Sequence, residues 1–371
     1  MKILYLFTVD YNKEIRDCQS GKVPTHRLWG YVETARMGHE PFACPTPRYF
    51  RKQLSKPIFW RIYQALFAFW KQRDVDCIFA INEASVIPVL ALKWLRVLRT
   101  PVVIVSTGIM NVRNRSGKRK AMWKALLPCA DAIVSLSTME RDATWREFGL
   151  REERQHLVNM LVDTNYFTPS GPLGTGDYCL SAGTNEGRDY PTLLKAFPRE
   201  EKLLIVTDPY NAAIIEKNKA PGQQVEVKQA IPIDQLKRLY ENAKAIINPI
   251  GEVDFASGHT ILLENMSLGR PVIVSMVRGM KDYFQDGVTA IGVIPYDAED
   301  LGRKLRAYLA APEKFAAIGQ QAQEWVRRFS AEEFARKLLV IAARLAGREP
   351  VEGEADAKSI GPVGPVGPMK A

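Results

Sequence analysis

Cysteine and histidine are scarce in this chain of 371 residues, which has five cysteines and four histidines. The cysteines lie far apart, form no CxxC pair and have no histidine at the spacing of a zinc site. The sequence therefore excludes a disulfide scaffold and a zinc finger. Free thiols of this kind are typical of a reducing compartment, so we expect a cytoplasmic protein.

Long uncharged apolar runs are also missing. The most apolar stretch, ASVIPVLALKWLRVL, is interrupted by Lys93 and Arg96, whereas a membrane-spanning helix needs about 18 or more such residues. The first residues, MKILYLFTVD, have one lysine and only a short apolar run, which predicts a β-strand and not a signal peptide. An apolar content of 46% and a charged content of 25% are typical of a globular protein.

Short apolar runs rich in β-branched residues alternate with helical patterns along the whole chain. Continuous apolar strands separated by helices indicate parallel sheets that are covered on both faces. We therefore predict an α/β protein with doubly wound sheets. The predicted strands cover residues 2–8, 77–81, 101–105, 132–136, 178–181, 203–207, 245–248 and 271–275. The predicted helices between them include residues 58–70, 118–127, 191–197, 233–242 and 300–310.

The length suits two domains of ordinary size. The segment VDTNYFTPSGPLGTGD, residues 162–177, is rich in Pro, Gly, Ser and Thr and marks the boundary. Ser330 and Glu333 form a capping box at the start of a further helix. We predict an N-terminal domain, a C-terminal domain, a closing helix and a disordered Gly/Pro-rich tail, which cover residues 1–165, 166–328, 329–347 and 348–371.

The stretch ASGHTILLENMSLGRPVIVS, residues 256–275, combines a helix start with a carboxylate and a buried strand. Ser257 is a good N-cap, and Gly258 lets a ligand approach the backbone. A helix N-terminus is a natural site for a phosphate, and Glu264 lies two turns further on the same face. Its two acceptor oxygens suit a vicinal diol such as a ribose. The alternative is an ordinary amphipathic helix with a solvent-facing glutamate.

The longer segment ASGHTILLENMSLGRPVIVSMVRGMKDYFQDGVTAIGVIPYDAEDL resembles the donor-site region of retaining glycosyltransferases of family four (group 1), which have the GT-B fold. LSAGTNEGRDYPTLLKAF resembles the family's glycine loop and basic residue, VEVKQAIPIDQLKRLYENAKAIINPI its base-binding strand and next helix, and LVDTNYFTP its interdomain connector. The likeness is good over residues 157–334 and covers the first half only in outline. It implies two Rossmann-like domains that face a cleft and a nucleotide-sugar donor.

The resemblance implies donor-binding roles for six residues. Glu264 matches the glutamate that binds the nucleotide ribose, and Arg188 matches the basic residue that neutralises the diphosphate. Four further positions match contacts to the donor: Gly258 and His259 at the diphosphate and transferred sugar, with His259 as a hydrogen-bond donor, and Val227 and Lys228 at the base.

Three positions depart from the family's pattern. Ala256 replaces a glutamate that touches the transferred sugar, and Glu252 or Asp254 is close enough to substitute for it. Thr107 stands where a histidine is common, so no general base is evident. Thr184 stands where a second basic residue is common. The catalytic residue stays open, with Thr107 and His259 as candidates.

No metal site is expected. Asp74 and Asp76 form a DxD sequence, but they directly precede a predicted strand, where a buried strand commonly begins. The loop before the first helix should border the cleft, so His26 and Arg27 are candidates for acceptor contacts. The two other histidines, His39 and His156, are expected to be structural.

The positive charge is concentrated in the first half. Residues 1–165 hold 26 Lys and Arg against 15 Asp and Glu, a net charge of +11, whereas the whole chain has +10. Residues 47–73 interleave aromatic and basic side chains, and residues 112–124 add a second basic run. No nucleic-acid-binding motif accompanies them, so no nucleic acid partner is expected. Peripheral contact with an anionic membrane surface is one interpretation, and a packed helix with a solvated basic face is the other.

We therefore expect a retaining, metal-independent glycosyltransferase without a cofactor. It would transfer a sugar from a UDP-sugar or GDP-sugar to a lipid-linked or saccharide acceptor, as in the synthesis of cell-envelope polysaccharide or glycolipid, at the inner face of the membrane. A nucleotide-sugar 2-epimerase on the same fold, which needs no acceptor, is one alternative. A non-catalytic module that binds lipid or polyanion is the other, because Ala256 and Thr107 are consistent with a decayed donor site.

Overall fold

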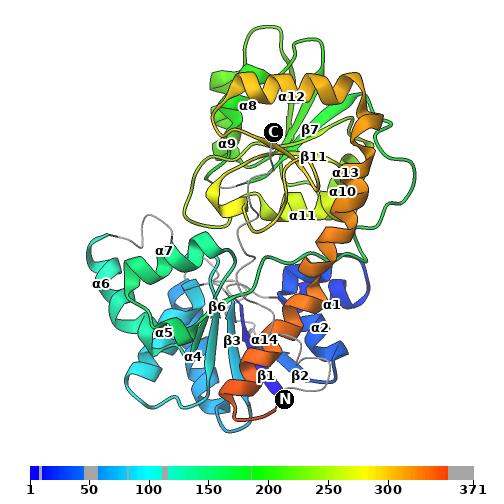
Figure 1. Cartoon of the computed structure of the whole chain (residues 1–371). Coiled ribbons are helices and arrows are strands. Elements are labelled where there is room, and N and C mark those ends of the chain that lie inside the picture. The colour runs from blue at the N-terminus through cyan, green and yellow to red at the C-terminus, as the bar shows by residue number, and fades with distance from the viewer. Residues whose placement is uncertain (8–10, 46–56, 82, 111–115, 185, 350–371) are drawn as a thin grey trace, which may run out of the picture.

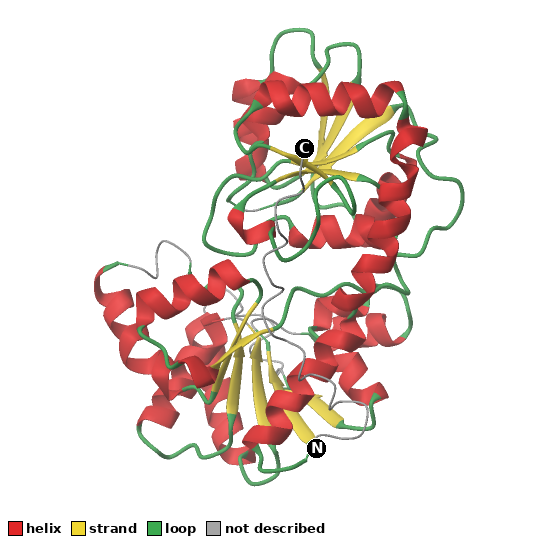
Figure 2. Cartoon of the chain, in the orientation of Figure 1, coloured by secondary structure: helices red, strands yellow, loops and turns green. Residues whose placement is uncertain are grey.

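The computed structural model describes residues 1–7, 11–45, 57–81, 83–110, 116–184 and 186–349. They form two lobes, each built around a six-stranded sheet in which all the paired strands are parallel (Figures 1 and 2). The predicted fold class, two doubly wound Rossmann-like units, is confirmed.

The first sheet has the strand order β2-β1-β3-β4-β5-β6. Its central strands are completely buried because each consists of apolar residues in direct succession, as in the segments CIFAI and VVIV. The strand bounds are β1 Lys2–Leu6, β2 Glu40–Ala43, β3 Cys77–Ile81, β4 Val102–Val105, β5 Ala132–Ser135 and β6 Gln155–Leu157.

The second sheet has the order β12-β11-β10-β7-β8-β9. Its strand order reverses between β7 and β10, which places the carboxyl ends of these two strands at a topological switch point, the usual ligand site of open α/β sheets. The strand bounds are β7 Tyr178–Ala182, β8 Lys202–Val206, β9 Gln224–Lys228, β10 Ile246–Asn248, β11 Val272–Ser275 and β12 Ile291–Val293.

All eight strands predicted from apolar runs are present, within one or two residues at each end. The four other strands, β2, β6, β9 and β12, lie at the edges of the two sheets. Edge strands are short or only half covered, so they lack the continuous apolar run on which the prediction depended. Only β9 was indicated in advance, by the family resemblance.

Helices cover both faces of each sheet. The main helices of the first half are α1 Asn12–Gln19, α2 Tyr31–Arg36, α4 Pro57–Lys71, α5 Glu83–Trp94, α6 Gly117–Leu126 and α7 Thr138–Phe148, with the 3₁₀ helix η1 Thr25–Leu28 between α1 and α2. Those of the second half are α8 Tyr190–Ala196, α9 Pro209–Asn218, α10 Ile233–Asn242, α11 His259–Ser267, α12 Ala298–Ala310, α13 Ala316–Trp325 and α14 Ala331–Leu345.

The last helix, α14, returns to the first lobe (Figure 1). Ser330 caps it by accepting a hydrogen bond from the backbone N–H of Glu333 at 3.1 Å, as the capping box predicts. Phe334 and Leu338 pack into the same buried cluster as Tyr5. The helices α1 and α2 on this face are short, so α14 supplies the remaining cover for the first sheet.

Direct contacts join the two lobes beside the start of α7. The hydroxyl of Tyr283 donates a hydrogen bond to the carbonyl of Leu136 and accepts one from the N–H of Met160 at 2.7 Å. The carboxylate of Asp282 accepts hydrogen bonds from the N–H and hydroxyl of Thr138. These bonds hold the carboxyl ends of the first sheet against the second lobe.

Candidate active site

A cavity of about 470 Å³ lies between the lobes. Both lobes contribute to its walls, and most of the contributing loops follow the carboxyl ends of strands, where a doubly wound fold places its ligands. From the first lobe and the connector come Trp29, Thr107, Leu136 and Met160; from the second come residues that include Gly183, Thr184, Arg188, Ala230, Ile231, Ala256, Ser257, Gly258, His259 and Glu264.

The helix α11 begins at the cavity. The structure corrects the predicted cap, because Gly258 and not Ser257 holds the N-cap position, with a φ of +77°. A side chain there would also collide with Ile250, whose Cδ1 atom lies 2.3 Å from the position of an added Cβ. The hydroxyl of Ser257 is buried and has no hydrogen-bond partner in the described protein. It is therefore available, with the first N–H groups of α11, to bind an anion.

Arg188 lies across the cavity wall from the start of α11. Its Nη1 donates a hydrogen bond to the Oδ1 of Asn248 at 2.7 Å, and Asn248 in turn donates to the carbonyl of Gly258 at 2.9 Å. The guanidinium also lies so close to Gly183 that a Cβ there would be 2.1 Å from Cζ. Asn248 thus connects the guanidinium to the helix start, so two groups that can bind an anion lie close together.

Glu264 lies on the second turn of α11 and is 2% exposed. The hydroxyl of Tyr240 donates a hydrogen bond to its Oε2 at 3.0 Å, and the Nε2 of His26 lies 3.6 Å from its Oε1. Burial raises the pKa of Glu264 to about 8, because few polar groups replace the water that a carboxylate would otherwise bind. The alternative of a solvent-facing glutamate is therefore wrong.

His259 lines the cavity, but its proton has another partner. Its Nε2 lies 3.0 Å from the carbonyl of Gly279, a distance at which the ring must be the donor. Burial lowers the pKa of His259 to about 4, so the ring is neutral at pH 7 and carries one proton. Its predicted role as a hydrogen-bond donor to sugar or phosphate conflicts with this tautomer, because the other nitrogen, Nδ1, can only accept.

The predicted base contacts lie at the end of β9. Val227 packs against the core of the second lobe, and Lys228 forms an ion pair with Glu226 at 3.4 Å. Neither residue lines the cavity, whereas Ala230 and Ile231, which follow β9, do. The prediction concerned backbone contacts of Val227 and Lys228, so it stays a prediction; β9 ends at Lys228, and the loop beyond the strand reaches the cavity.

The predicted acceptor contacts of His26 and Arg27 stay a prediction. Neither is among the residues that line the cavity. Arg27 forms an ion pair with Glu14 at 2.6 Å, and His26 is buried between the lobes. The first lobe presents the neighbouring Trp29 instead, with a φ of +52°, which the sequence analysis did not single out. No local pattern distinguishes Trp29, because its orientation depends on this unusual backbone conformation.

The three departures from the family's pattern lie at the cavity, because Ala256, Thr107 and Thr184 all line it. Glu252 and Asp254, the candidate substitutes for the missing glutamate, do not line the cavity. Both form ion pairs with Arg278 at 3.2 Å. The structure therefore does not support their substitution for the missing glutamate at Ala256.

Within the described ranges, no three His, Cys, Asp or Glu side chains are grouped as metal ligands. The two aspartates of the DxD sequence contact other protein groups. Asp74 forms an ion pair with Lys71 at 3.0 Å, and Asp76 accepts a hydrogen bond from the backbone N–H of Lys2 at 2.7 Å. Both aspartates thus stabilise the entry to the first sheet.

Comparisons with solved structures agree with this architecture. A sucrose-phosphate synthase from Thermosynechococcus elongatus aligns with a TM-score of 0.69 and 17% identity, over 94% of this chain and 99% of that one. The Anabaena protein HepE, solved in complex with UDP-glucose, aligns with a TM-score of 0.66 and 15% identity, over 94% of this chain and 100% of that one. At these identities the similarity establishes the fold alone.

Sequence comparisons identify the family. A D-inositol 3-phosphate glycosyltransferase from Catenulispora acidiphila is 22% identical over 245 residues, which are 58% of this chain and 58% of that protein. The model of glycosyl transferases group 1 matches residues 185–325, and the model of glycosyltransferase family 4 matches residues 10–166. Since the two models together account for most of both lobes and for most of the cavity between them, this chain belongs to the glycosyltransferases of the family-four type.

Proposed function

We propose that this protein transfers a sugar from a nucleotide-sugar donor to an acceptor, with retention of anomeric configuration and without a metal ion. The observation that supports this most directly is the cavity, around which the start of α11, the guanidinium of Arg188 and the carboxylate of Glu264 are gathered. An anion site beside a diol acceptor matches a nucleoside diphosphate. The family matches favour this function over a 2-epimerase or a non-catalytic binding module.

The residues that line the cavity also support a retaining mechanism. Of the described lining residues, only Glu264 carries a carboxylate, and it is assigned to the ribose. His259 is neutral and donates to Gly279, so neither supplies a nucleophile or a strong base for the transferred sugar. The leaving diphosphate, held by Arg188 and α11, would then accept the proton of the acceptor hydroxyl on the same face from which it departs.

A nucleoside diphosphate should stabilise the protein in the presence of a chelator. Thermal unfolding with UDP and with GDP, each in EDTA and in excess Mg²⁺, measures this directly. At a ligand concentration of 100 times Kd, the free energy of unfolding should rise by about 2.7 kcal/mol. Arg188 and the start of α11 can neutralise the diphosphate alone, so the two media should give equal shifts.

Stabilisation that requires Mg²⁺ would contradict the metal-independent proposal. Failure of every nucleoside diphosphate in a panel of four bases would contradict the donor site itself. A matched control is inorganic phosphate, which shares the charge but lacks the ribose and should stabilise the protein far less at the same concentration.

We further propose that the first lobe meets an anionic membrane surface through α4, where a lipid-linked acceptor would be reached. Five large apolar side chains follow its outer face at helical spacing: Phe59, Ile62, Leu66, Phe69 and Trp70, of which Trp70 is 83% exposed. The helix has two basic residues and no acidic one. This charge favours an anionic bilayer over a second copy of an equally basic surface. In the described part of the chain, no helix is long and apolar enough to span a bilayer.

Replacing Phe59, Leu66 and Trp70 by serine should abolish flotation with vesicles that contain acidic lipid. A matched control replaces Trp145 and Tyr210, which are 54% and 62% exposed on other helices. The unsubstituted protein should bind acidic vesicles much more than neutral ones, and 1 M salt should weaken binding because it shortens the Debye length to about 3 Å. Equal binding to both vesicle types, or an equal loss in the control, would refute the assignment. The basic residues Arg51, Lys52 and Lys56, also expected to contribute, lie outside the described residues.

A further inference from the structure

His26 lies between the lobes, and each of its two ring nitrogens faces a different group. It belongs to η1, is 7% exposed, and its ring stacks on Phe167 of the connector at 5.8 Å between ring centroids. Its Nδ1 accepts a hydrogen bond from the backbone N–H of Asp163 at 3.1 Å. A neutral ring that accepts at Nδ1 must carry its proton on Nε2. That Nε2 is the atom 3.6 Å from the Oε1 of Glu264.

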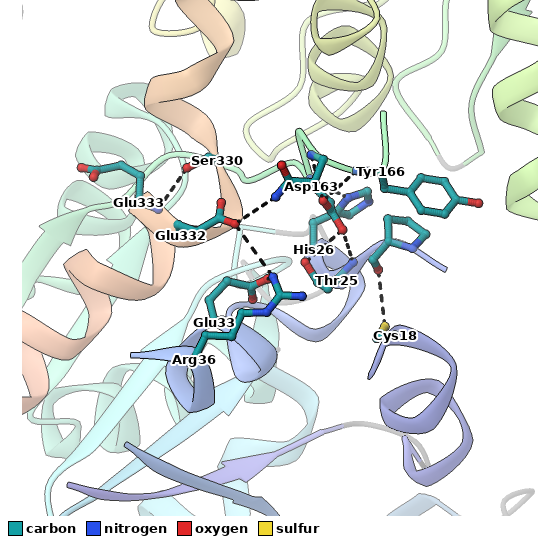
Figure 3. A network of polar contacts seen from close by, with 12 residues as sticks. Cys18, Thr25, His26, Glu33, Arg36, Asp163, Tyr166, Ser330, Glu332 and Glu333 are labelled. Carbon is teal, nitrogen blue, oxygen red and sulfur yellow. Dashed lines mark hydrogen bonds and ion pairs between the residues drawn. The ribbon is translucent and has the colours of Figure 1, made fainter. Parts of the chain in front are cut away.

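The orientation of this ring is fixed by a network around Asp163 (Figure 3). The Oδ2 of Asp163 accepts hydrogen bonds from the N–H and hydroxyl of Thr25, at 2.8 and 3.1 Å. Its Oδ1 accepts from the N–H groups of Asn165 and Tyr166, at 3.1 and 2.9 Å. The connector is thus clamped to η1, and the backbone N–H that faces His26 cannot rotate away.

The carboxylate of Glu264 is contacted from both lobes. Tyr240 of the second lobe donates to one oxygen, and the Nε2 of His26 from the first lobe lies 3.6 Å from the other. At 3.6 Å the second contact is longer than a hydrogen bond, but in a buried site an N–H dipole still acts strongly on a carboxylate. Burial lowers the pKa of His26 to about 4, so this contact is dipolar and not an ion pair at pH 7.

We propose that His26 is a positioning residue: its Nε2–H group orients the carboxylate of Glu264 for the nucleotide ribose. This rests on the proposed function, in which Glu264 binds that ribose. His26 and Glu264 belong to different lobes, and the connector that holds the ring joins them. Through His26 the first lobe therefore contributes to nucleotide affinity without contacting the nucleotide. A change in the angle between the lobes would move His26 relative to Glu264 and so change the affinity for the ribose.

Two substitutions distinguish the role of Nδ1, which contacts Asp163, from the role of Nε2, which faces Glu264. In His26→Asn, the side-chain oxygen can still accept from the N–H of Asp163, but nothing reaches Glu264. In His26→Gln, an N–H group can again reach the carboxylate. We expect His26→Asn to weaken UDP binding about three- to tenfold by calorimetry (GDP replaces UDP if only GDP stabilises the protein), and His26→Gln to restore most of it.

The decisive comparison repeats both substitutions in a Glu264→Gln background, as a double-mutant cycle. If His26 acts through Glu264, His26→Asn should cost almost nothing further there. An equal loss in both backgrounds, or a His26→Gln variant as weak as His26→Asn, would overturn the proposal. Unfolding temperatures of all variants show whether a loss reflects folding. If His26→Asn is unfolded, His26→Gln, which has an N–H donor, is compared with His26→Leu, which has none.

A second readout is the pH dependence of UDP binding. Among the residues that the structure describes, the other titratable or charged groups that interact with Glu264 are Tyr240 on α10, Arg27 on η1 and Tyr166 on the connector. All three are unchanged in these variants. Losing an N–H that favours the carboxylate should move the binding midpoint to higher pH. Failure of the unsubstituted protein to bind any nucleoside diphosphate would refute the proposed function, whereas normal UDP binding by His26→Asn, or by Glu264→Gln, would refute only this inference.

Discussion

Replacing Glu264 by glutamine should weaken binding of the nucleoside diphosphate on the order of tenfold to a hundredfold. A hydrogen bond to a charged acceptor contributes about 1.5–3 kcal/mol, and each 1.4 kcal/mol corresponds to a factor of about ten. Glutamine preserves the shape of the side chain and leaves an oxygen to accept from Tyr240, so the fold should survive. Calorimetry with UDP or GDP, together with the unfolding temperature, checks both statements.

The same residue predicts a pH dependence. Burial raises the pKa of Glu264 to about 8, and a ribose diol that donates to the carboxylate favours its charged form. Affinity should therefore rise between pH 7 and pH 8 and level off above it. A terminal phosphate has its last pKa near about 6, so it has already titrated in this window. Glu264→Gln should bind with a nearly flat profile.

A matched control for this prediction is Glu241→Gln on α10. Glu241 is 7% exposed, and its carboxylate accepts a hydrogen bond from the backbone N–H of Ser170. Unlike Glu264, it does not line the cavity. It should leave nucleotide affinity unchanged. Unchanged affinity in a folded Glu264→Gln protein would place the ribose elsewhere.

Replacing Trp60 by alanine should lower the free energy of unfolding by about 3–5 kcal/mol, the usual cost of removing a large buried aromatic side chain. Trp60 is 2% exposed and packs into the cluster that contains Leu4 and Ile78, with its ring stacked on Tyr63 at 5.7 Å. Alanine is the better helix former, so the loss would come from packing alone. Urea unfolding followed by circular dichroism measures it.

The adjacent substitution, Phe59→Ala, is the control. Phe59 is 55% exposed, and a surface substitution of this kind usually changes stability by less than about 0.5 kcal/mol. The sequence predicts a single environment, membrane-facing or packed, for the aromatic residues of segment 47–73, which include Phe59 and Trp60. The structure separates them, since one ring faces outward and the other is buried. Equal losses of stability would contradict that separation.

The fold was predictable wherever the signal was local. Strands such as β3 and β4 are buried on both faces, so their composition alone reveals them. The helix start was predicted to within one residue, at Ser257 where the structure has Gly258, because small polar residues ahead of an apolar helical pattern are a local signal. The edge strand β2, with the sequence EPFA, has no such signal, since its role is defined by the neighbour with which it pairs.

The candidate site was predictable in its chemistry and less so in its geometry. Arg188 and Glu264 were selected by residue type and resemblance, and both line the cavity. Val227 and Lys228 do not line the cavity, whereas the loop after them does, because the end of β9 depends on its pairing with β8. Trp29 was missed, because only its positive φ, next to the close approach of Gly30 to Ala335, brings it to the cavity.

The sequence by itself determined the class of the fold and the two-part organisation of its strands, and it selected Arg188 and Glu264 as candidate site residues. Each of these depends on residues that are close together in the sequence, because periodicity and residue type determine local structure directly. Only the tertiary structure decided which face of α4 is buried, that α14 covers the first sheet, and that His26 meets Glu264. The contacts of α14 and of His26 join residues far apart in the sequence and depend on how the two lobes are brought together. The buried face of α4 depends on its packing against strands of its own lobe, such as those that hold Leu4 and Ile78. No local pattern encodes either.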